Sequence, residues 1–227
     1  MGSDDLFKKK KEERKKRKYA ERTPYPNSYL IITEGKKTEP LYFKGLIYEI
    51  KQRHGGNINV EEIPRIKVMG EGRCTVSLVE KAEEIVNKSK IIYENVWLVF
   101  DKDDFQDFDK AIKLAEEKGF KVAWSNECFE YWIYLHFNYT DAALHREEWY
   151  EKLTVIFNER GINGGKYEKN YKDIFVAVSK EDGLDRAIAN AQKIMKEYDG
   201  TSIPPQKCNP GTMVHKLVEE LKIYLTN

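Results

Sequence analysis

The residues best suited to chemistry are acids that follow short apolar runs. Asp101 and Asp103 come directly after Val96–Phe100, a run rich in β-branched and aromatic residues that predicts a buried strand. The two aspartates are two positions apart, so they project to the same side of an extended chain. Two converging carboxylates repel each other, and a divalent cation bound through oxygen ligands is the usual remedy. The pattern therefore predicts a metal site at the end of this strand.

A further acid, Glu34, follows an earlier predicted strand, residues 29–33. The helix expected next has Thr38 as its N-cap and Pro40 in its first turn. Strand ends at one edge of an open α/β sheet hold its ligands, so Glu34 is expected beside Asp101 and Asp103. An oxygen-rich set of this kind favours Mg²⁺ or Mn²⁺ over Zn²⁺. We predict all three as metal ligands and catalytic residues, with Glu34 also suited to act as a general acid or base.

Three more acids are candidates for a supporting role or a third acid: Asp104, Glu130 and Glu39. Glu130 lies near the start of a predicted helix, residues 125–137, on the same rim of the sheet. Alternation along the strand turns Asp104 away from the other aspartates. The alternative for the whole group is that these acids are solvated turns and helix caps. His136, on the apolar face of the same helix, is expected to be a core histidine rather than a ligand.

Basic residues near these acids are candidates for phosphate or nucleic-acid contacts. A helix N-terminus attracts anions, and the lysines before Thr38 strengthen that field. The glycine-containing stretch 70–73 is a weak phosphate-loop signal and more typical of a simple connection. The Lys/Tyr-rich segment 167–171 suits either a phosphate-contacting loop or, the favoured interpretation, a solvated loop. The candidates are Lys36, Lys37, Arg73, Lys102 and Lys166.

Composition limits the class of protein. The chain has 227 residues, of which 34% are charged, and no run approaches the ~18 apolar residues of a membrane span. Its first residues are charged, unlike a secretory signal, and its three cysteines are isolated. We therefore expect a soluble cytoplasmic protein with reduced thiols and no membrane partner.

Positive charge is concentrated near the start of the chain. Residues 8–18 hold nine basic and two acidic side chains, whereas the formal net charge of the whole chain is only +1. Such a basic arm often binds nucleic acid through its phosphates. A plain solubility tail is an equally weighted alternative.

The order of predicted strands and helices favours an α/β fold with a mostly parallel sheet and right-handed crossovers. Further helices are expected near 75–89, 105–118, 141–160 and 181–197, and a last one after Thr212. We predict three regions: a flexible basic arm (1–24), a compact α/β core (25–138), and a mainly helical extension packed on the core (139–227).

Several strings resemble known families. Glu34-Gly35 after one strand and Asp101-Lys102-Asp103 after another resemble the Toprim pattern. Longer strings are similar to the RloB-like family, and they span almost the whole chain: residues 33–43, 101–105, 125–137 and 209–217, together with the basic start. One departure is Glu127, where the family string has proline; it adds a carboxylate beside the expected site.

The resemblance implies a compact Toprim-like α/β core and Mg²⁺- or Mn²⁺-dependent phosphodiester chemistry on nucleic acid, in prokaryotic antiphage or abortive-infection defence. By likeness to the Toprim motif, Glu34 would be the general acid or base, and Asp101 and Asp103 the metal ligands. DNA, RNA and tRNA all remain open as the substrate, as does the oligomeric state. A partner ATPase or another defence protein is a further expected partner.

Two other classes of function compete with a nuclease. One is a non-catalytic subunit that binds a nucleotide, a metal or a partner protein in the same pocket. The other is a topoisomerase- or primase-like activity, which ranks last because the sequence shows no catalytic tyrosine domain and no zinc module.

Overall fold

The structure is a computed structural model that describes residues 8–10, 12, 22–54, 65–72, 75–102, 104 and 106–226. Two predicted site residues, Asp103 and Arg73, lie outside the described residues, as does most of the basic arm. Within the part of the chain that is described, no helix is both long and apolar enough to cross a membrane.

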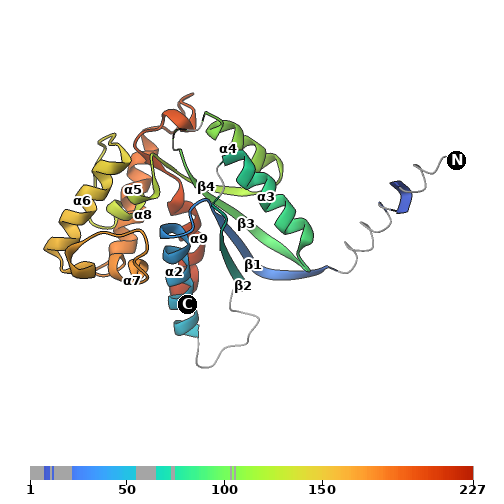
Figure 1. Ribbon diagram of the computed structural model, residues 1–227, viewed down its shortest axis with the longest axis horizontal. Helices are drawn as coiled ribbons and strands as arrows, with labels where there is room; N and C mark the ends of the chain where they lie inside the picture. The colour runs from blue at the N-terminus through green and yellow to red at the C-terminus, as the bar shows by residue number, and fades with distance from the viewer. Residues whose placement is uncertain are drawn as a thin grey trace.

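A five-stranded sheet lies at the centre of the molecule (Figure 1), in the order β2-β1-β3-β4-β5. The first four strands in this order are parallel neighbours, and β5 is antiparallel to β4. The strands are β1 Thr23–Thr33, β2 Arg65–Gly70, β3 Ile91–Asp101, β4 Lys121–Asn126 and β5 Gly211–Thr212. The predicted mostly parallel α/β fold is confirmed.

Helices cover both faces of the sheet. Figure 1 shows α3 and α4 on one face, α2 and α9 on the other, and α5 to α8 grouped beside the second set. The bounds are α2 Thr38–His54, α3 Thr75–Lys88, α4 Phe108–Glu117, α5 Phe129–Leu135, α6 Arg146–Glu159, α7 Ile174–Val178, α8 Gly183–Lys196 and α9 Val214–Thr226. Two short 3₁₀ helices, η1 Ile162–Gly165 and η2 Pro205–Lys207, lie in the helical second part of the chain.

The central strands are apolar on both sides because each face carries its own core. Val96–Phe100 in β3 is buried throughout, as expected for a parallel strand covered by helices. Alternate residues point to opposite faces. Trp97 and Val99 pack with the larger cluster of α2 and α5 to α9, whereas Leu98 and Phe100 pack with α3 and α4. Residues after 138 share the larger cluster with the sheet, so the helical extension packs on the core.

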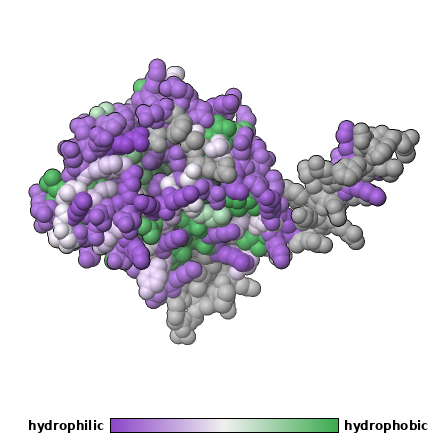
Figure 2. All heavy atoms as spheres, in the orientation of Figure 1, coloured by the Kyte–Doolittle hydropathy of each residue, from purple (hydrophilic) through white to green (hydrophobic). Residues whose placement is uncertain are grey.

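The face of the molecule shown in Figure 2 is largely hydrophilic. Hydrophobic side chains gather near its centre, around the strands of Figure 1, and smaller hydrophobic areas lie toward its upper and left edges.

Three local features differ from the prediction. β1 begins at Thr23 instead of residue 29, because a register shift between Tyr25 and Tyr29 lets the proline-containing start pair with β3. The short β5 was not predicted. The five-residue helix α7 was not predicted, since so short a segment shows little periodicity.

The helix expected over residues 125–137 begins later, at Phe129, as α5. Ser125 and Asn126 still belong to β4, where Ser125 Oγ bonds Thr212 Oγ1 at 3.0 Å and Asn126 Nδ2 donates to the Gln206 carbonyl at 3.0 Å. The N-cap residue is Cys128, and its side chain makes no capping hydrogen bond. The antiparallel pairing with β5 extends β4 past the expected turn.

Candidate functional site: an acidic pocket at the strand ends

The register of β1 and β3 brings Glu34 and Asp101 together. Thr33 pairs with Val99, so β3 continues for two residues beyond the end of β1. The Glu34 amide donates to the Val99 carbonyl at 2.8 Å, and Glu34 Oε2 accepts the Asp101 amide at 3.1 Å. The two acids that the sequence places after separate strands are therefore neighbours at one edge of the sheet.

A glycine after Glu34 allows a third acid to approach. The Gly35 amide donates to Glu39 Oε1 at 3.2 Å. A Cβ atom at position 35 would lie 2.2 Å from Glu39 Oε2, so a side chain here would displace that carboxylate. The turn that ends β1 thus holds the first turn of α2 against the strand end, with Glu39 buried beneath it.

The loop after β2 closes on the same turn. The Gly72 amide donates to the Glu34 carbonyl at 2.8 Å. Gly72 has a φ of +63°, and a Cβ atom there would lie 2.3 Å from Cε of Lys36. The Lys36 side chain therefore lies directly over Gly72. This contact fixes the position of the lysine at the mouth of the site.

Glu130 reaches the site from the first turn of α5. Its side chain is 2% exposed, and its Oε1 accepts the Tyr167 hydroxyl at 2.8 Å. Lys169 places its Nζ 3.9 Å from the same oxygen. A buried carboxylate requires such partners because removal from water disfavours its charge.

These residues line one pocket of about 340 Å³. Four carboxylates and four cationic side chains face it, which makes it strongly polar. The lining residues are Glu34, Gly35, Lys36, Lys37, Thr38, Glu39, Asp101, Cys128, Glu130, Arg146, Tyr150 and Lys169.

The electrostatic surroundings of Asp101 disfavour its charged form. Burial raises its pKa well above the usual range of an aspartate, and the charges of Glu39, Glu130 and Glu34 raise it further. Its Oδ1 is buried and has no hydrogen-bond partner. A carboxylate oxygen in this situation is stabilised only by a proton or a cation.

The charges crowded in this pocket also shift the pKa values of Glu39 and Lys169. Burial, with the charge of Glu130, raises the pKa of Glu39 to about 7. Burial alone would lower the pKa of Lys169, but the charge of Glu130 and the Tyr150 hydroxyl raise it overall. The pocket therefore favours the charged form of Lys169 and disfavours the charged form of Glu39.

The donor chemistry suits an oxygen-seeking cation, although the described residues alone do not make a complete site. Asp101 Oδ1 is an unpartnered oxygen among further carboxylates, the type of donor that Mg²⁺ and Mn²⁺ prefer. Among the residues that the structure describes, no three or more Asp, Glu, His or Cys side chains could hold a metal ion. Asp103, the second predicted ligand, is not one of those residues.

The other sequence candidates fall into two groups. Lys36 and Lys37 line the pocket, together with Glu39 and Glu130. The remaining described candidates do not line it: Asp104 and Lys166 are exposed, and Lys102 is half-buried beyond the rim.

His136 is confirmed as a core histidine. It is fully buried, its Nδ1 donates to the Trp132 carbonyl at 3.0 Å, and its Nε2 accepts the Tyr42 hydroxyl at 3.0 Å. A carbonyl can only accept, so the hydrogen sits on Nδ1. Burial lowers the pKa of this imidazole to about 3, which keeps it neutral.

Three polar side chains of the pocket, Arg146, Tyr150 and Lys169, were not among the site residues named from the sequence. Arg146 and Tyr150 stand on α6, and the Arg146 amide donates to Glu127 Oε2 at 3.1 Å. Glu127, the residue that departs from the family string, thus holds the start of α6 in place. Lys169 lies in the segment 167–171, for which a solvated loop was favoured; that interpretation is wrong for Tyr167, which is 6% exposed. The Lys/Tyr composition of this segment was the feature of the sequence that indicated a contribution to the site.

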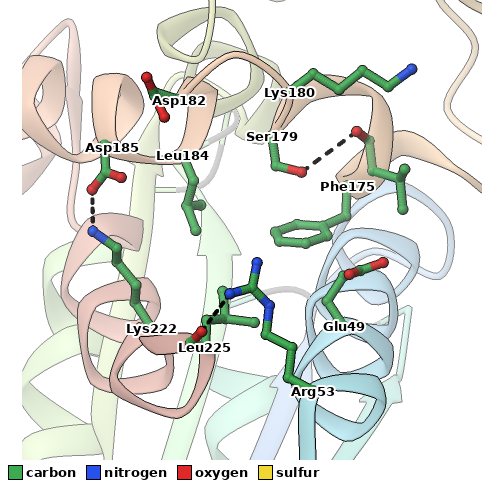
Figure 3. A pocket seen from close by; sticks show the side chains of 11 residues that line it. Glu49, Arg53, Phe175, Ser179, Lys180, Asp182, Leu184, Asp185, Lys222 and Leu225 are labelled. Carbon is green, nitrogen blue, oxygen red and sulfur yellow. Dashed lines mark hydrogen bonds and ion pairs between the residues drawn. The ribbon is translucent and has the colours of Figure 1, made fainter. Parts of the chain in front are cut away.

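A second pocket, of about 410 Å³, lies at the other end of α2 (Figure 3). An ion pair between Lys222 and Asp185 closes one side of it. Arg53 extends from α2 and donates to the Leu225 carbonyl at 2.6 Å. None of the sequence candidates lines this pocket, and it contains no unpartnered buried carboxylate of the kind found at Asp101. The smaller pocket is therefore the better candidate site.

Comparison with known proteins agrees with the motifs. Searches of the curated proteins and of the solved structures gave no match. The family model described as RloB-like protein matches residues 29–221, a span that contains the end of β1, all of β2 to β5 and every described residue of the acidic pocket. The chain belongs to the RloB-like protein family.

Proposed function

We propose that this protein is a Mg²⁺- or Mn²⁺-dependent nuclease that hydrolyses phosphodiester bonds at the acidic pocket, in prokaryotic antiphage defence. The observation that carries the proposal is the buried, unpartnered Oδ1 of Asp101 beside Glu34 at the strand ends. The likeness of Glu34-Gly35 and Asp101-Lys102-Asp103 to the Toprim pattern supports the same chemistry.

The roles of the acids follow from their positions. Asp101, together with Asp103, would hold the ion, and Glu34 would act as acid or base. A divalent ion bound there supplies stabilisation for the negative charge that develops on the transferring phosphoryl group. Such an ion would also provide a partner for Asp101 Oδ1, which has no hydrogen-bond partner.

Hydrolysis also requires proton transfers. A water oxygen bonds to phosphorus as the bond to the leaving oxygen breaks; the water loses a proton and the leaving oxygen gains one. Glu34 is held by the Asp101 amide at its Oε2, so its carboxylate is oriented at the pocket before any substrate arrives. It would take the proton from the water or deliver one to the leaving oxygen.

A cleavage screen tests this proposal. The purified full chain is incubated with single-stranded DNA, duplex DNA, mRNA and tRNA, each with Mg²⁺, with Mn²⁺ and with a chelator. We expect metal-dependent cleavage of at least one substrate, and its loss by a factor of a hundred or more in Asp101→Asn and Glu34→Gln. Glu117→Gln, an exposed position on α4, is the matched control. Cleavage retained in both site variants would contradict the assignment.

A second candidate function is a non-catalytic subunit that binds a nucleotide or a metal in the same pocket. One observation favours a nucleotide as the ligand of such a subunit: four cationic side chains line the pocket, whereas the described residues do not supply three metal-binding side chains. Calorimetric titration separates the two functions. A subunit of this kind would bind Mn²⁺ or a nucleotide while all four nucleic acids in the screen stayed intact.

We also propose the cytoplasm as the site of action and nucleic acid as the main partner. Cys128 and Cys208 are buried free thiols, which suits a reducing compartment. A defence protein such as an ATPase would be a further partner. A pull-down from the native host would identify it, and recovery of the chain from the periplasm would contradict the proposed location.

A further inference from the structure

The acidic pocket is built from two parts of the chain. The strand ends and the helices α2 and α5 provide its carboxylates. Residues after 138 provide the facing wall, which consists of Arg146 and Tyr150 from α6 and Lys169 from the segment before α7. The wall therefore adds positive charge and an aromatic ring opposite the acids.

The segment 167–171, which we call the strap, is fixed to the core on both sides of Lys169. The Tyr167 hydroxyl donates to Glu130 Oε1 at 2.8 Å, and the Lys169 carbonyl accepts the Thr38 hydroxyl at 3.3 Å. The Tyr167 ring is buried against Phe157, edge to face with centroids 5.5 Å apart. The Lys169 backbone is thus held in place before a ligand binds, which lowers the entropic cost of binding.

The ammonium group of Lys169 is oriented but retains capacity to bind. It lies 3.9 Å from Glu130 Oε1, beyond hydrogen-bond distance, and 4.8 Å from the centre of the Tyr150 ring. The side chain is 52% exposed, so a ligand in the pocket can reach it. An ammonium has three donors, and these contacts leave donors for an anion.

Charge and size indicate which anion fits. The four cations of the pocket already match its four carboxylates, so a bound divalent ion would leave positive charge in excess. A phosphate group would balance that excess. A volume of about 340 Å³ is at the small end of ligand pockets, which suits one nucleotide rather than a duplex.

We propose that Lys169 binds the phosphate of a single nucleotide unit of the substrate and positions it against the acids of the core. The inference rests on the proposed function for the identity of the substrate as nucleic acid. The strap thereby gives the site a preference for a single-stranded or frayed stretch, since only such a stretch can place one nucleotide in so small a pocket.

Binding of nucleoside 5′-monophosphates tests this role without any cleavage step. AMP, GMP, CMP and UMP are titrated separately into the full chain with Mg²⁺, by calorimetry. We expect wild-type protein to bind at least one of them, and Lys169→Gln to weaken that binding about tenfold or more through loss of a charge-assisted hydrogen bond. Lys169→Arg should retain most of the affinity because it keeps the charge.

Lys172→Gln is the matched control, since Lys172 is an exposed lysine close in sequence that does not line the pocket. It should bind as wild type does. Equal affinity of Lys169→Gln and wild type, or failure of wild type to bind any monophosphate, would overturn the inference.

The experiments can contradict the nuclease proposal and the proposed role of Lys169 independently of each other. Monophosphate binding that depends on Lys169 in a protein that cleaves nothing would contradict the nuclease and support this role of the strap. Cleavage that depends on Asp101 but is unchanged, in KM and kcat, in Lys169→Gln would contradict the role of Lys169 and leave the nuclease intact. If Lys169 acts as proposed, Lys169→Gln raises KM, and Lys169→Arg restores it.

Discussion

Asp101 combines a half-buried side chain, repulsion from three neighbouring acids and a buried Oδ1 without a hydrogen-bond partner, a combination that folding alone does not favour. Glu34 engages the Asp101 amide rather than its carboxylate, and Glu39 and Glu130 add repulsion. Functional sites commonly retain such costs because the strained group is needed for binding or chemistry. A bound cation would turn this unfavourable arrangement into a favourable one.

The first prediction concerns stability at this residue. Asp101→Asn should raise the melting temperature of the chelator-treated protein at pH 7, since it removes a buried carboxylate that faces three other acids. Each kcal/mol gained corresponds to about 2–4 °C for a chain of this size. Differential scanning fluorimetry measures the shift.

Adding Mg²⁺ supplies the internal control. The ion should stabilise the wild type by mass action and have little effect on Asp101→Asn, so the difference between the two should shrink. A lower melting temperature for Asp101→Asn in chelator would show that the carboxylate has a structural partner, and the argument from strain would fail.

At the scale of elements, the strap shows how tertiary contacts override local sequence. Residues 167–171 are largely polar and follow closely after Gly164 and Gly165, a composition typical of a solvated loop. The structure instead buries Tyr167 among Phe157, Tyr150 and Glu130. These contacts join residues far apart in sequence, so no local pattern encodes them.

The second prediction tests the anchor of the strap. Tyr167→Phe removes the hydroxyl that donates to Glu130 but keeps the ring in its packing site. Leaving a buried carboxylate with one donor fewer should cost about 1–3 kcal/mol, measured as the free energy of unfolding in urea. Tyr48→Phe is the control, because the Tyr48 side chain is largely exposed on α2. Equal losses in the two variants would mean that the bond to Glu130 adds nothing to stability.

At the scale of the whole molecule, the sequence predicts the architecture better than its details. Apolar runs such as Val96–Phe100 and the amphipathic helices between them determine an α/β sandwich, and the order of elements makes most of the sheet parallel. Glu34 and Asp101 could be placed together because parallel strands end at one edge. The short β5 and the start of β1 depend on pairing partners distant in sequence, so periodicity did not reveal them.

Contacts between residues distant in sequence also limit what can be predicted about the pocket. Its carboxylates follow from strand ends and helix starts, which local patterns mark. Its opposite wall requires α6 and the strap to fold back from beyond residue 138, and Arg146, Tyr150 and Lys169 carry no motif that announces this. Sequence reasoning found the half of the site that topology determines.

The third prediction concerns the stability of the whole fold against acid. Burial lowers the pKa of His136 to about 3 and that of His215 to about 4, from 6.5 in each case. The unfolded chain therefore binds these protons first. The stabilisation is complete above pH 6.5 and is lost as the pH falls below that value.

Each histidine should contribute up to about 1.4 kcal/mol per pH unit to the slope of unfolding free energy between pH 6 and pH 4. His136→Phe should remove one such contribution and flatten the slope, as measured by urea unfolding across this range. An unaltered slope in His136→Phe would contradict the burial argument.

The central claim is that Asp101 and its neighbours hold a divalent ion for phosphodiester hydrolysis. Its most direct test is the rate of nucleic-acid cleavage as Mn²⁺ concentration rises, measured side by side for wild type, Asp101→Asn and the control Glu117→Gln. We predict saturating activation by Mn²⁺ in wild type and in Glu117→Gln, and no activation in Asp101→Asn at any concentration. Equal activation of Asp101→Asn and wild type would contradict the claim.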